Sequence, residues 1–244
     1  MNNMPEGGTQ SIASAHLLFT EFAVEKTREM EGDYENSSEY SAEPDGSKSS
    51  NQLRLEQTHD SLAMYAGISS IAYLDAHINE FYYDHIELHD DRYDIHEYKP
   101  ESEWQHMLKK YYEVEGDDFY YKPTLEKYQT ILILIGEDTF DKGAVPFQHI
   151  STLVDFRNYF IHYQTERYKS YGQVDEIEHR IGNALQGMFD LNPMAYEGLP
   201  FFPDHCLSHG FAEWAFEYSK EFVVDFYEMV PAEPFPVPAT KHVL

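Results

Sequence analysis

Apolar residues in this chain recur at helical spacing, and no segment shows the alternating pattern of a half-buried strand. The longest helical pattern runs from about Gln52 to His89, where apolar and small residues dominate the middle. A helix that is apolar around most of its circumference is normally buried, so this segment is predicted to be the central core helix. Residues 131–135 (Ile-Leu-Ile-Leu-Ile) have the composition of a strand, but a helical pattern leads into them. The sequence therefore predicts an all-α fold.

Shorter helical patterns divide the rest of the chain and predict, with the central helix, a bundle of about six helices in one domain. They cover residues 11–30, 101–112, 124–135, 146–168, 174–188 and 204–229. The stretch from Glu31 to Ser50 holds six acids and one lysine and is predicted to be a mobile acidic loop. The expected organisation is an N-terminal helix and acidic loop over residues 1–50, the helical domain over 51–230, and a proline-rich disordered tail over 231–244.

Charge and composition exclude several classes of protein. The chain carries 44 acidic against 17 basic residues, a formal net charge of −27. A surface this acidic repels nucleic acid and anionic membranes at low salt. The longest apolar run, residues 131–135, is far shorter than the ~20 residues that a membrane span needs. One cysteine, Cys206, excludes an intramolecular disulfide, so we expect a cytoplasmic protein.

One segment combines three residues that can carry out chemistry, namely Arg157, Asn158 and His162. On a helix, Asn158 and His162 are four residues apart and share a face, and the long side chain of Arg157 can reach the same region. Histidine exchanges a proton near neutral pH, arginine binds phosphate, and asparagine can hydrogen-bond to either partner. The trio suits metal-free cleavage of RNA, in which the ribose 2′-hydroxyl attacks the adjacent phosphorus. A symmetric dimer would supply the second histidine, as general acid.

The spacing alone is a weak signal. The same separation occurs at Arg54 and His59, where no asparagine follows the arginine. In the simplest structural interpretation, Arg157 and Asn158 face solvent and His162 ends a helix. Acids are nevertheless sparse around the motif, because residues 146–169 contain two, Asp155 and Glu166. The net charge therefore does not forbid a local phosphate site, but it predicts weak, salt-sensitive binding of RNA.

The motif resembles the signature of HEPN domains, in which histidine follows arginine after four to six residues, often with asparagine directly after the arginine. Residues 66–80 are similar to an early helix of that family, and the C-terminal helix around His209, Trp214 and Tyr218 is compatible with it. The family is a helical bundle and commonly dimeric. Many members are metal-independent ribonucleases of toxin–antitoxin and antiviral defence systems, and others are inactive and serve as interaction modules.

The resemblance implies that Arg157 and His162 form a catalytic pair and that Asn158 is a polar helper. It implies a homodimer that cleaves RNA without a metal or other cofactor and has an antitoxin or other protein as a candidate partner. Toxins paired with a nucleotidyltransferase antitoxin often extend the motif to His-x-Tyr, whereas Tyr163 directly follows His162 here. The alternative is a catalytically inactive HEPN-like module that binds proteins or nucleotides.

Three other patterns are candidate sites. Glu-x-x-His occurs at Glu56/His59, Glu103/His106 and Glu176/His179, and two such pairs with further glutamates would form a di-iron site in a bundle. A divalent-cation site could involve His85, His89 and the acids that follow, although an exposed helix end explains them too. Cys206 is expected to be a buried thiol, and the aromatic residues of the last helix are expected in the core or at a dimer interface.

Overall fold

A computed structural model describes residues 11–36, 48–87, 103–162, 176–196 and 198–231. Seven α-helices lie in these residues: α1 (Ile12–Asn36), α2 (Ser50–Glu87), α3 (Glu103–Glu115), α4 (Thr124–Leu134), α5 (Phe147–Ile161), α6 (Glu176–Leu185) and α7 (His209–Met229). Two short turns accompany them, the 3-10 turn η2 (Gly116–Tyr121) and the π-turn η3 (Phe201–His205). The described residues contain no strand, so the predicted all-α bundle is confirmed. None of the described helices is both long enough and apolar enough to cross a membrane.

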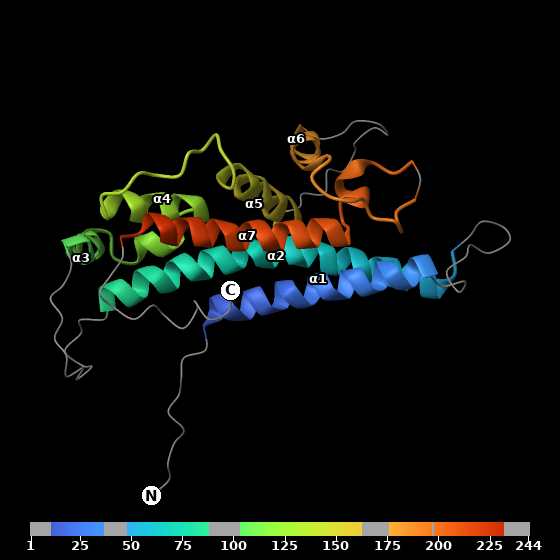
Figure 1. Cartoon of the computed structure of the whole chain (residues 1–244), viewed down its shortest axis with the longest axis horizontal. Helices are drawn as coiled ribbons and strands as arrows, with labels where there is room; N and C mark the ends of the chain where they lie inside the picture. Colours follow the sequence, from blue (N-terminus) through green and yellow to red (C-terminus); the bar gives the residue numbers. More distant parts are fainter. Residues whose placement is uncertain (1–10, 37–47, 88–102, 163–175, 197, 232–244) are drawn as a thin grey trace, which may run out of the picture.

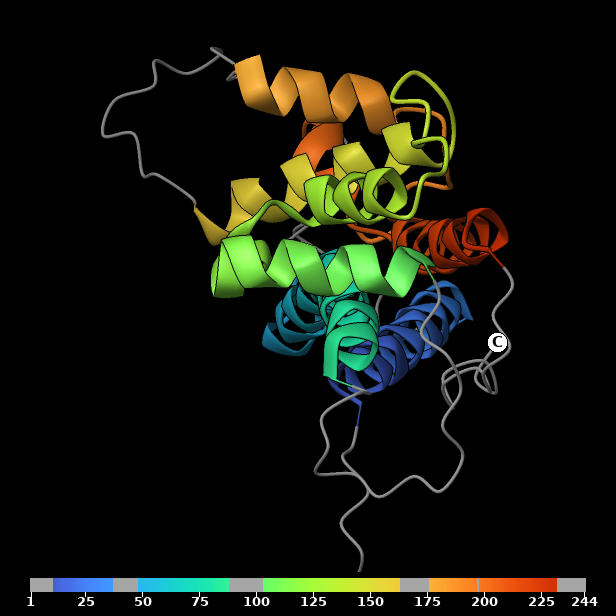
Figure 2. The same ribbon diagram turned by 90° about the vertical axis from the view of Figure 1, so that its left-hand side faces the viewer.

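The three long helices α1, α2 and α7 lie along the long axis of the molecule and pack on one another (Figure 1). Helices α1 and α2 are antiparallel, because Ser11 bonds to Glu80 at 2.8 Å at one end and Glu31 bonds to His59 at 2.9 Å at the other. Helices α4, α5 and α6 form a second layer on the side opposite α1 (Figure 2). The core therefore lies around α2, as expected from its apolar middle.

Small residues in α2 allow its neighbours to approach closely. Ala63, Ala66 and Gly67 are buried. A Cβ atom placed on Gly67 would lie 2.8 Å from Phe211 of α7 and 2.9 Å from Phe156 of α5. The aromatic residues of α7 fill the core that results, since Phe211, Phe222 and Phe226 are fully buried.

The predicted acidic loop is wrong at its start, because α1 continues to Asn36. The carboxylate of Glu31 accepts hydrogen bonds from His59 at 2.9 Å and from the backbone N–H of His209 at 2.6 Å. These bonds tie α1 to α2 and α7, so Glu31 is a structural residue. Residues 37–47 of the predicted loop, the N-terminal residues 1–10 and most of the predicted tail (232–244) lie outside the described residues.

Helix α3 continues to Glu115, three residues beyond its predicted end, and three other helix ends also differ from the prediction. Helix α7 begins at His209 rather than Asp204, because Ser208 caps it by accepting a hydrogen bond from the backbone N–H of Phe211 at 3.0 Å. Helix α6 ends at Leu185, two residues before Gly187, whose φ of +80° ends the helical path. Helix α5 ends at Ile161, and the rest of its predicted extent, residues 163–168, lies outside the described part of the chain.

The core also contains a buried polar group, His77 of α2. Its Nδ1 lies 3.1 Å from the hydroxyl of Tyr128, which itself donates to the carbonyl oxygen of Leu74 at 3.0 Å. We therefore assign the His77 proton to Nδ1, which leaves Nε2 to accept from the hydroxyl of Tyr227 at 3.2 Å. Burial lowers the pKa of His77 to about 4, so the neutral ring is the form that the core stabilises.

The close approach at Gly67 gives the first prediction. Gly67→Ala should lower the free energy of unfolding by roughly 1–3 kcal/mol, because the added methyl displaces two buried rings and this cost exceeds the gain in helix propensity. Gly32→Ala is the matched control, since no atom lies within 4 Å of its Cβ position in α1. That variant should gain roughly 0.5–1 kcal/mol. Urea unfolding of both proteins measures the difference, and an unchanged stability of Gly67→Ala would contradict the packing.

His77 gives a prediction for pH. Its pKa is about 4 in the folded chain against 6.5 in the unfolded chain, so the stability that depends on the neutral ring is complete above pH 6.5. It should be lost as the pH falls from 6.5 to 4, by up to about 3 kcal/mol. His77→Phe should remove this part of the acid sensitivity, although it destabilises the protein at pH 7.5. Urea unfolding between pH 7.5 and 4.5 measures the slopes. The exposed-residue control His106→Phe should keep the wild-type slope, and equal slopes for wild type and His77→Phe would contradict the assignment.

Candidate functional site

Helix α5, which carries the Arg-Asn-x-x-x-His motif, is anchored by an apolar face. Its buried residues are Phe147, Ile150, Leu153 and Phe156. The ring of Phe156 lies against that of Phe211 in α7, with ring centroids 4.5 Å apart. Packing on both α2 and α7 fixes the helix, and with it the position of the side chains that face outward from α5.

The three motif residues lie at the C-terminal end of α5. Asn158 and His162 are exposed, and Arg157 is half-buried. His162 caps the helix, and its backbone N–H donates to the carbonyl oxygen of Asn158 at 2.9 Å. Asn158 and His162 therefore lie one helical turn apart at the surface.

The structure does not join the three motif side chains into one hydrogen-bonded group. Among the residues described, Arg157, Asn158 and His162 form no ion pair and no side-chain hydrogen bond. Five positions separate Arg157 from His162, so their directions around the helix differ by about 140°. A site that used both side chains would need a substrate or a second subunit to lie across this end of α5.

Neighbouring side chains hold the C-terminal end of α5 in place. Tyr159 lies 5.1 Å from Phe202 of η3, measured between ring centroids. Asp155 forms an ion pair with Arg180 of α6 at 2.9 Å, but Arg180 is exposed and Asp155 is partly exposed, and such pairs contribute little. The aromatic contacts are therefore the stronger support for the motif.

The second Arg-x4-His pattern, at Arg54 and His59, is structural. The His59 side chain is fully buried, with Nε2 bonded to Glu31 at 2.9 Å and Nδ1 facing Asp60 at 3.3 Å. Burial acts to lower the pKa of His59, but the hydrogen bonds to Asp60 and Glu31 outweigh it and raise the pKa above the usual value. Both ring nitrogens are occupied, so this histidine joins helices and is not accessible to a substrate.

Candidate metal ligands do not assemble in the described part of the chain. No group of three or more His, Cys, Asp or Glu residues is placed there to hold a metal ion. His106 is exposed, and His85 bonds through Nδ1 to the carbonyl oxygen of Phe81 at 2.5 Å. The side chains of Glu176 and His179, and residue His89, lie outside the described residues.

Cys206 is fully buried, as expected, although it follows η3 and precedes α7 rather than lying in a helix. Burial raises the pKa of its thiol well above the usual value. A buried thiol of this kind is unreactive, so Cys206 is a core residue.

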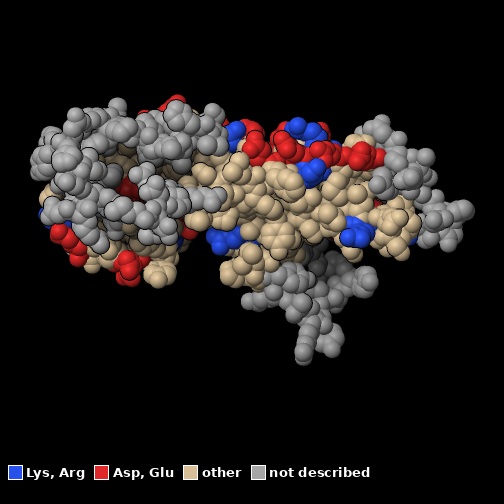
Figure 3. Space-filling view, turned by 90° about the horizontal axis from the view of Figure 1, so that it is seen from below, with Lys and Arg blue, Asp and Glu red and all other residues tan. Residues whose placement is uncertain are grey.

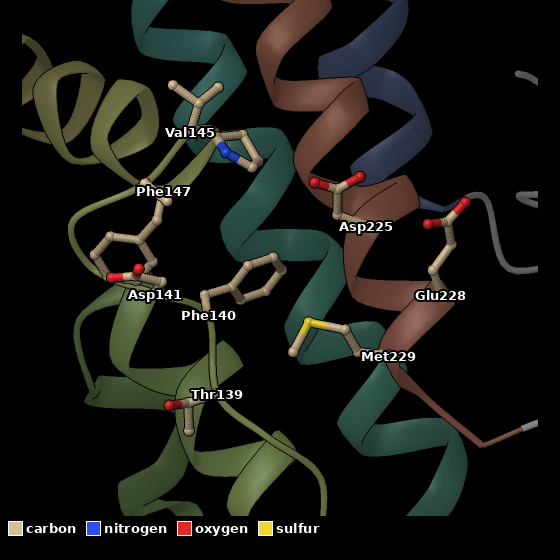
Figure 4. Close-up of a pocket in the computed structure, with 10 residues that line it drawn as sticks. Thr139, Phe140, Asp141, Val145, Phe147, Asp225, Glu228 and Met229 are labelled. Atoms are coloured by element: carbon tan, nitrogen blue, oxygen red, sulfur yellow. The ribbon is translucent and has the colours of Figure 1, made fainter.

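A pocket that the sequence analysis did not identify lies beside the start of α5. It has a volume of about 490 Å³ and is lined by residues 139–141, 144–147, Asp225, Glu228 and Met229. Phe140 and Met229 line it from the loop and from α7 (Figure 4). Burial, with a smaller effect from the negative charge of Glu228, raises the pKa of Asp225. No sequence signal predicts this pocket, because it needs the end of α7 to lie against a loop some 80 residues earlier in the chain.

The pocket and the motif are separate. Arg157 lies ten positions after Phe147 in α5, which corresponds to about 15 Å along the helix. The motif therefore lies on open surface and not in this pocket. Comparison of the chain with protein-family models, curated proteins and solved structures finds no match, so only its own residues bear on its function.

Substitutions on the two sides of α5 should differ in their effect on the free energy of unfolding, because one side is buried and the other carries the exposed motif. Phe156→Ala should lower the free energy of unfolding by roughly 3–5 kcal/mol, because it leaves a cavity between α2, α5 and α7. Asn158→Ala and His162→Ala should each change it by less than about 0.5 kcal/mol, since neither side chain bonds to a described residue. Urea unfolding measures all three. A large loss of stability in His162→Ala would show that His162 is a structural residue.

Proposed function

We propose that the chain is a metal-independent endoribonuclease of the HEPN type that acts as a homodimer in the cytoplasm. The observation that supports the proposal is the placement of Arg157, Asn158 and His162 at the exposed end of a rigidly anchored helix, without a structural partner among the described residues. Polar side chains that a rigid scaffold holds at the surface are positioned to bind a ligand. A toxin or a defence protein with a neutralising partner is the biological role that the resemblance implies.

In the proposed reaction, His162 removes the proton of the ribose 2′-hydroxyl. The 2′-oxygen forms a bond to the adjacent phosphorus, and the bond from phosphorus to the 5′-oxygen breaks. His162 of the partner subunit donates a proton to the leaving 5′-oxygen. Arg157 stabilises the added negative charge on the phosphoryl oxygens, and Asn158 orients the imidazole or the phosphate. The products carry a 2′,3′-cyclic phosphate and a free 5′-hydroxyl.

The directions of the motif side chains support a reaction in which two subunits share the catalytic roles. Arg157 and His162 diverge by about 140° around α5, so one subunit does not place both on a single phosphate through its helix alone. A second copy across the helix end would bring an arginine of one subunit near a histidine of the other. The proposal therefore depends on a dimer in which the two α5 ends face each other.

An inactive module that binds a protein is the second candidate function, and the charge of the chain favours it. At −27, the surface repels RNA outside the immediate region of the motif. A basic protein would be attracted to that surface instead. A folded wild-type protein that does not cleave RNA would support this second candidate.

Cleavage of RNA in the presence of chelator tests the first proposal. The wild-type protein should release fragments with 2′,3′-cyclic phosphate ends, and His162→Ala and Arg157→Ala should each reduce the rate by at least about 100-fold. The exposed-residue controls His106→Ala and Arg54→Ala remove the same residue types away from the motif and should retain the activity. The assay should be run over a range of salt concentrations, because low salt strengthens the contact of Arg157 with phosphate but also strengthens the repulsion between RNA and the acidic surface. Activity that persists in His162→Ala would contradict the assignment.

A further inference from the structure

Helix α1 is apolar on two opposite sides. One side faces α2 and α7 and contains the buried residues Ala13, Leu17, Thr20, Ala23, Val24 and Thr27. The other side carries large apolar residues exposed to solvent, namely Ile12 (59% exposed), Leu18 (53%), Phe19 (40%) and Phe22 (47%). Ala15 is exposed on the same side. The spacing of these five residues places them in one continuous stripe along the first three turns, which we call the outer stripe.

The outer stripe is unusual in so charged a chain. Residues 11–20 contain no Asp, Glu, Lys or Arg, although the whole chain has 61 of them (44 acidic and 17 basic). Seen from the side of α1, the middle of the molecule is largely uncharged, with a few basic residues on it, and acids gather along one edge (Figure 3). A helix that is apolar on both sides is normally covered on both, and a contiguous exposed apolar stripe marks an interaction surface.

The charge of the chain and the pattern of the stripe indicate what covers it. Two copies with a net charge of −27 repel each other wherever their acids meet, and the outer stripe offers a contact without facing carboxylates. The stripe is also complementary to itself in the antiparallel direction. When residue i faces residue 34 − i of a second copy, Ala15 lies opposite Phe19 and Ile12 lies opposite Phe22. The small residue then accepts the large ring.

We propose that the outer stripe is the contact through which two copies of this chain pair about a twofold axis, with their α1 helices antiparallel. In this arrangement Phe19 packs on Ala15 of the partner subunit, and Phe22 packs on Ile12 of the partner subunit. The contact is isologous, so each side chain of the stripe is used twice.

This contact is separate from the one that RNA cleavage would need. Helix α1 lies on the side of α2 opposite α5, so pairing through α1 leaves the two α5 motifs apart (Figures 1 and 2). The inference does not rest on the proposed function. If both contacts form, each chain contacts two others, and the smallest closed assembly is a tetramer.

Light scattering coupled to size-exclusion chromatography tests the contact. The wild-type protein should have a mass of at least twice the 28.6 kDa chain at micromolar concentration. Phe19→Asp with Phe22→Asp should halve the wild-type mass, whether that mass is a dimer or a tetramer. Val114→Asp, at a residue of α3 that is 79% exposed, adds the same kind of charge away from α1 and should leave the mass unchanged. A monomeric wild-type protein, or an unchanged mass in the double variant, would overturn the proposal.

Cross-linking tests the register without a charged substitution. A chain with Ala15→Cys and a differently tagged chain with Phe19→Cys should form a mixed disulfide on mild oxidation, because residues 15 and 19 face each other. Neither chain alone should form a covalent dimer efficiently, and buried Cys206 does not compete. Covalent pairing of Ala15→Cys with itself, or no pairing in the mixture, would contradict the antiparallel contact. The charged double variant should retain any cleavage of RNA by the wild-type protein, because the α1 contact is separate from the motif on α5, and the mass and cross-linking results alone decide the α1 inference.

Discussion

The burial of α2 is the constraint on which the rest of the structure depends. This helix of 38 residues is contacted by α1, α3, α4, α5 and α7. Its middle has small residues where rings of α5 and α7 approach and large residues further along, where the core widens around Leu74, Ile78 and Tyr82. Because each neighbour packs on a different part of α2, that single helix sets the positions of the others. The motif on α5 is placed by this packing and not by contacts of its own.

Apolar packing alone would allow the helices to slide along one another, and buried polar contacts of α2 limit that freedom. At one end, His59 bonds to Glu31 of α1, and the same carboxylate receives the backbone N–H that begins α7. Near the other end, Lys127 of α4 is almost fully buried and lies 2.9 Å from Asp75. A buried charge without its partner is costly, so these contacts penalise any shift in register. The polar residues of α2 thus specify an arrangement that its apolar residues stabilise.

The sequence predicted the presence of each helix well, but it predicted the helix ends and the candidate sites less well. Periodicity identified α2 and α4 to within about two residues because their apolar pattern is local. Glu31 was assigned to a loop because its neighbours are acidic and polar, and only the distant partners His59 and His209 explain why it is ordered. Spacing alone could not separate the two Arg-x4-His patterns either. The structure separates them by burial, since His59 is enclosed and His162 is exposed. The pocket beside Phe140 had no local signal at all.

The acidic charge of the chain affects both surfaces that are proposed to make contacts, the outer stripe of α1 and the motif at the end of α5. It leaves few places where a second copy or an RNA phosphate can approach, and those are the stretches in which acids are sparse. Residues 11–20 have no charged side chain, and the segment around Arg157 has few acids. One of these surfaces is apolar and the other carries a cation and a histidine, so they are suited to different contacts. The first is suited to a permanent contact, since apolar burial does not weaken with salt, whereas binding at the second depends on charge and weakens as salt rises. Salt concentration should therefore act on the two contacts in different ways, and the distribution of acids along the chain explains why both can exist on one molecule.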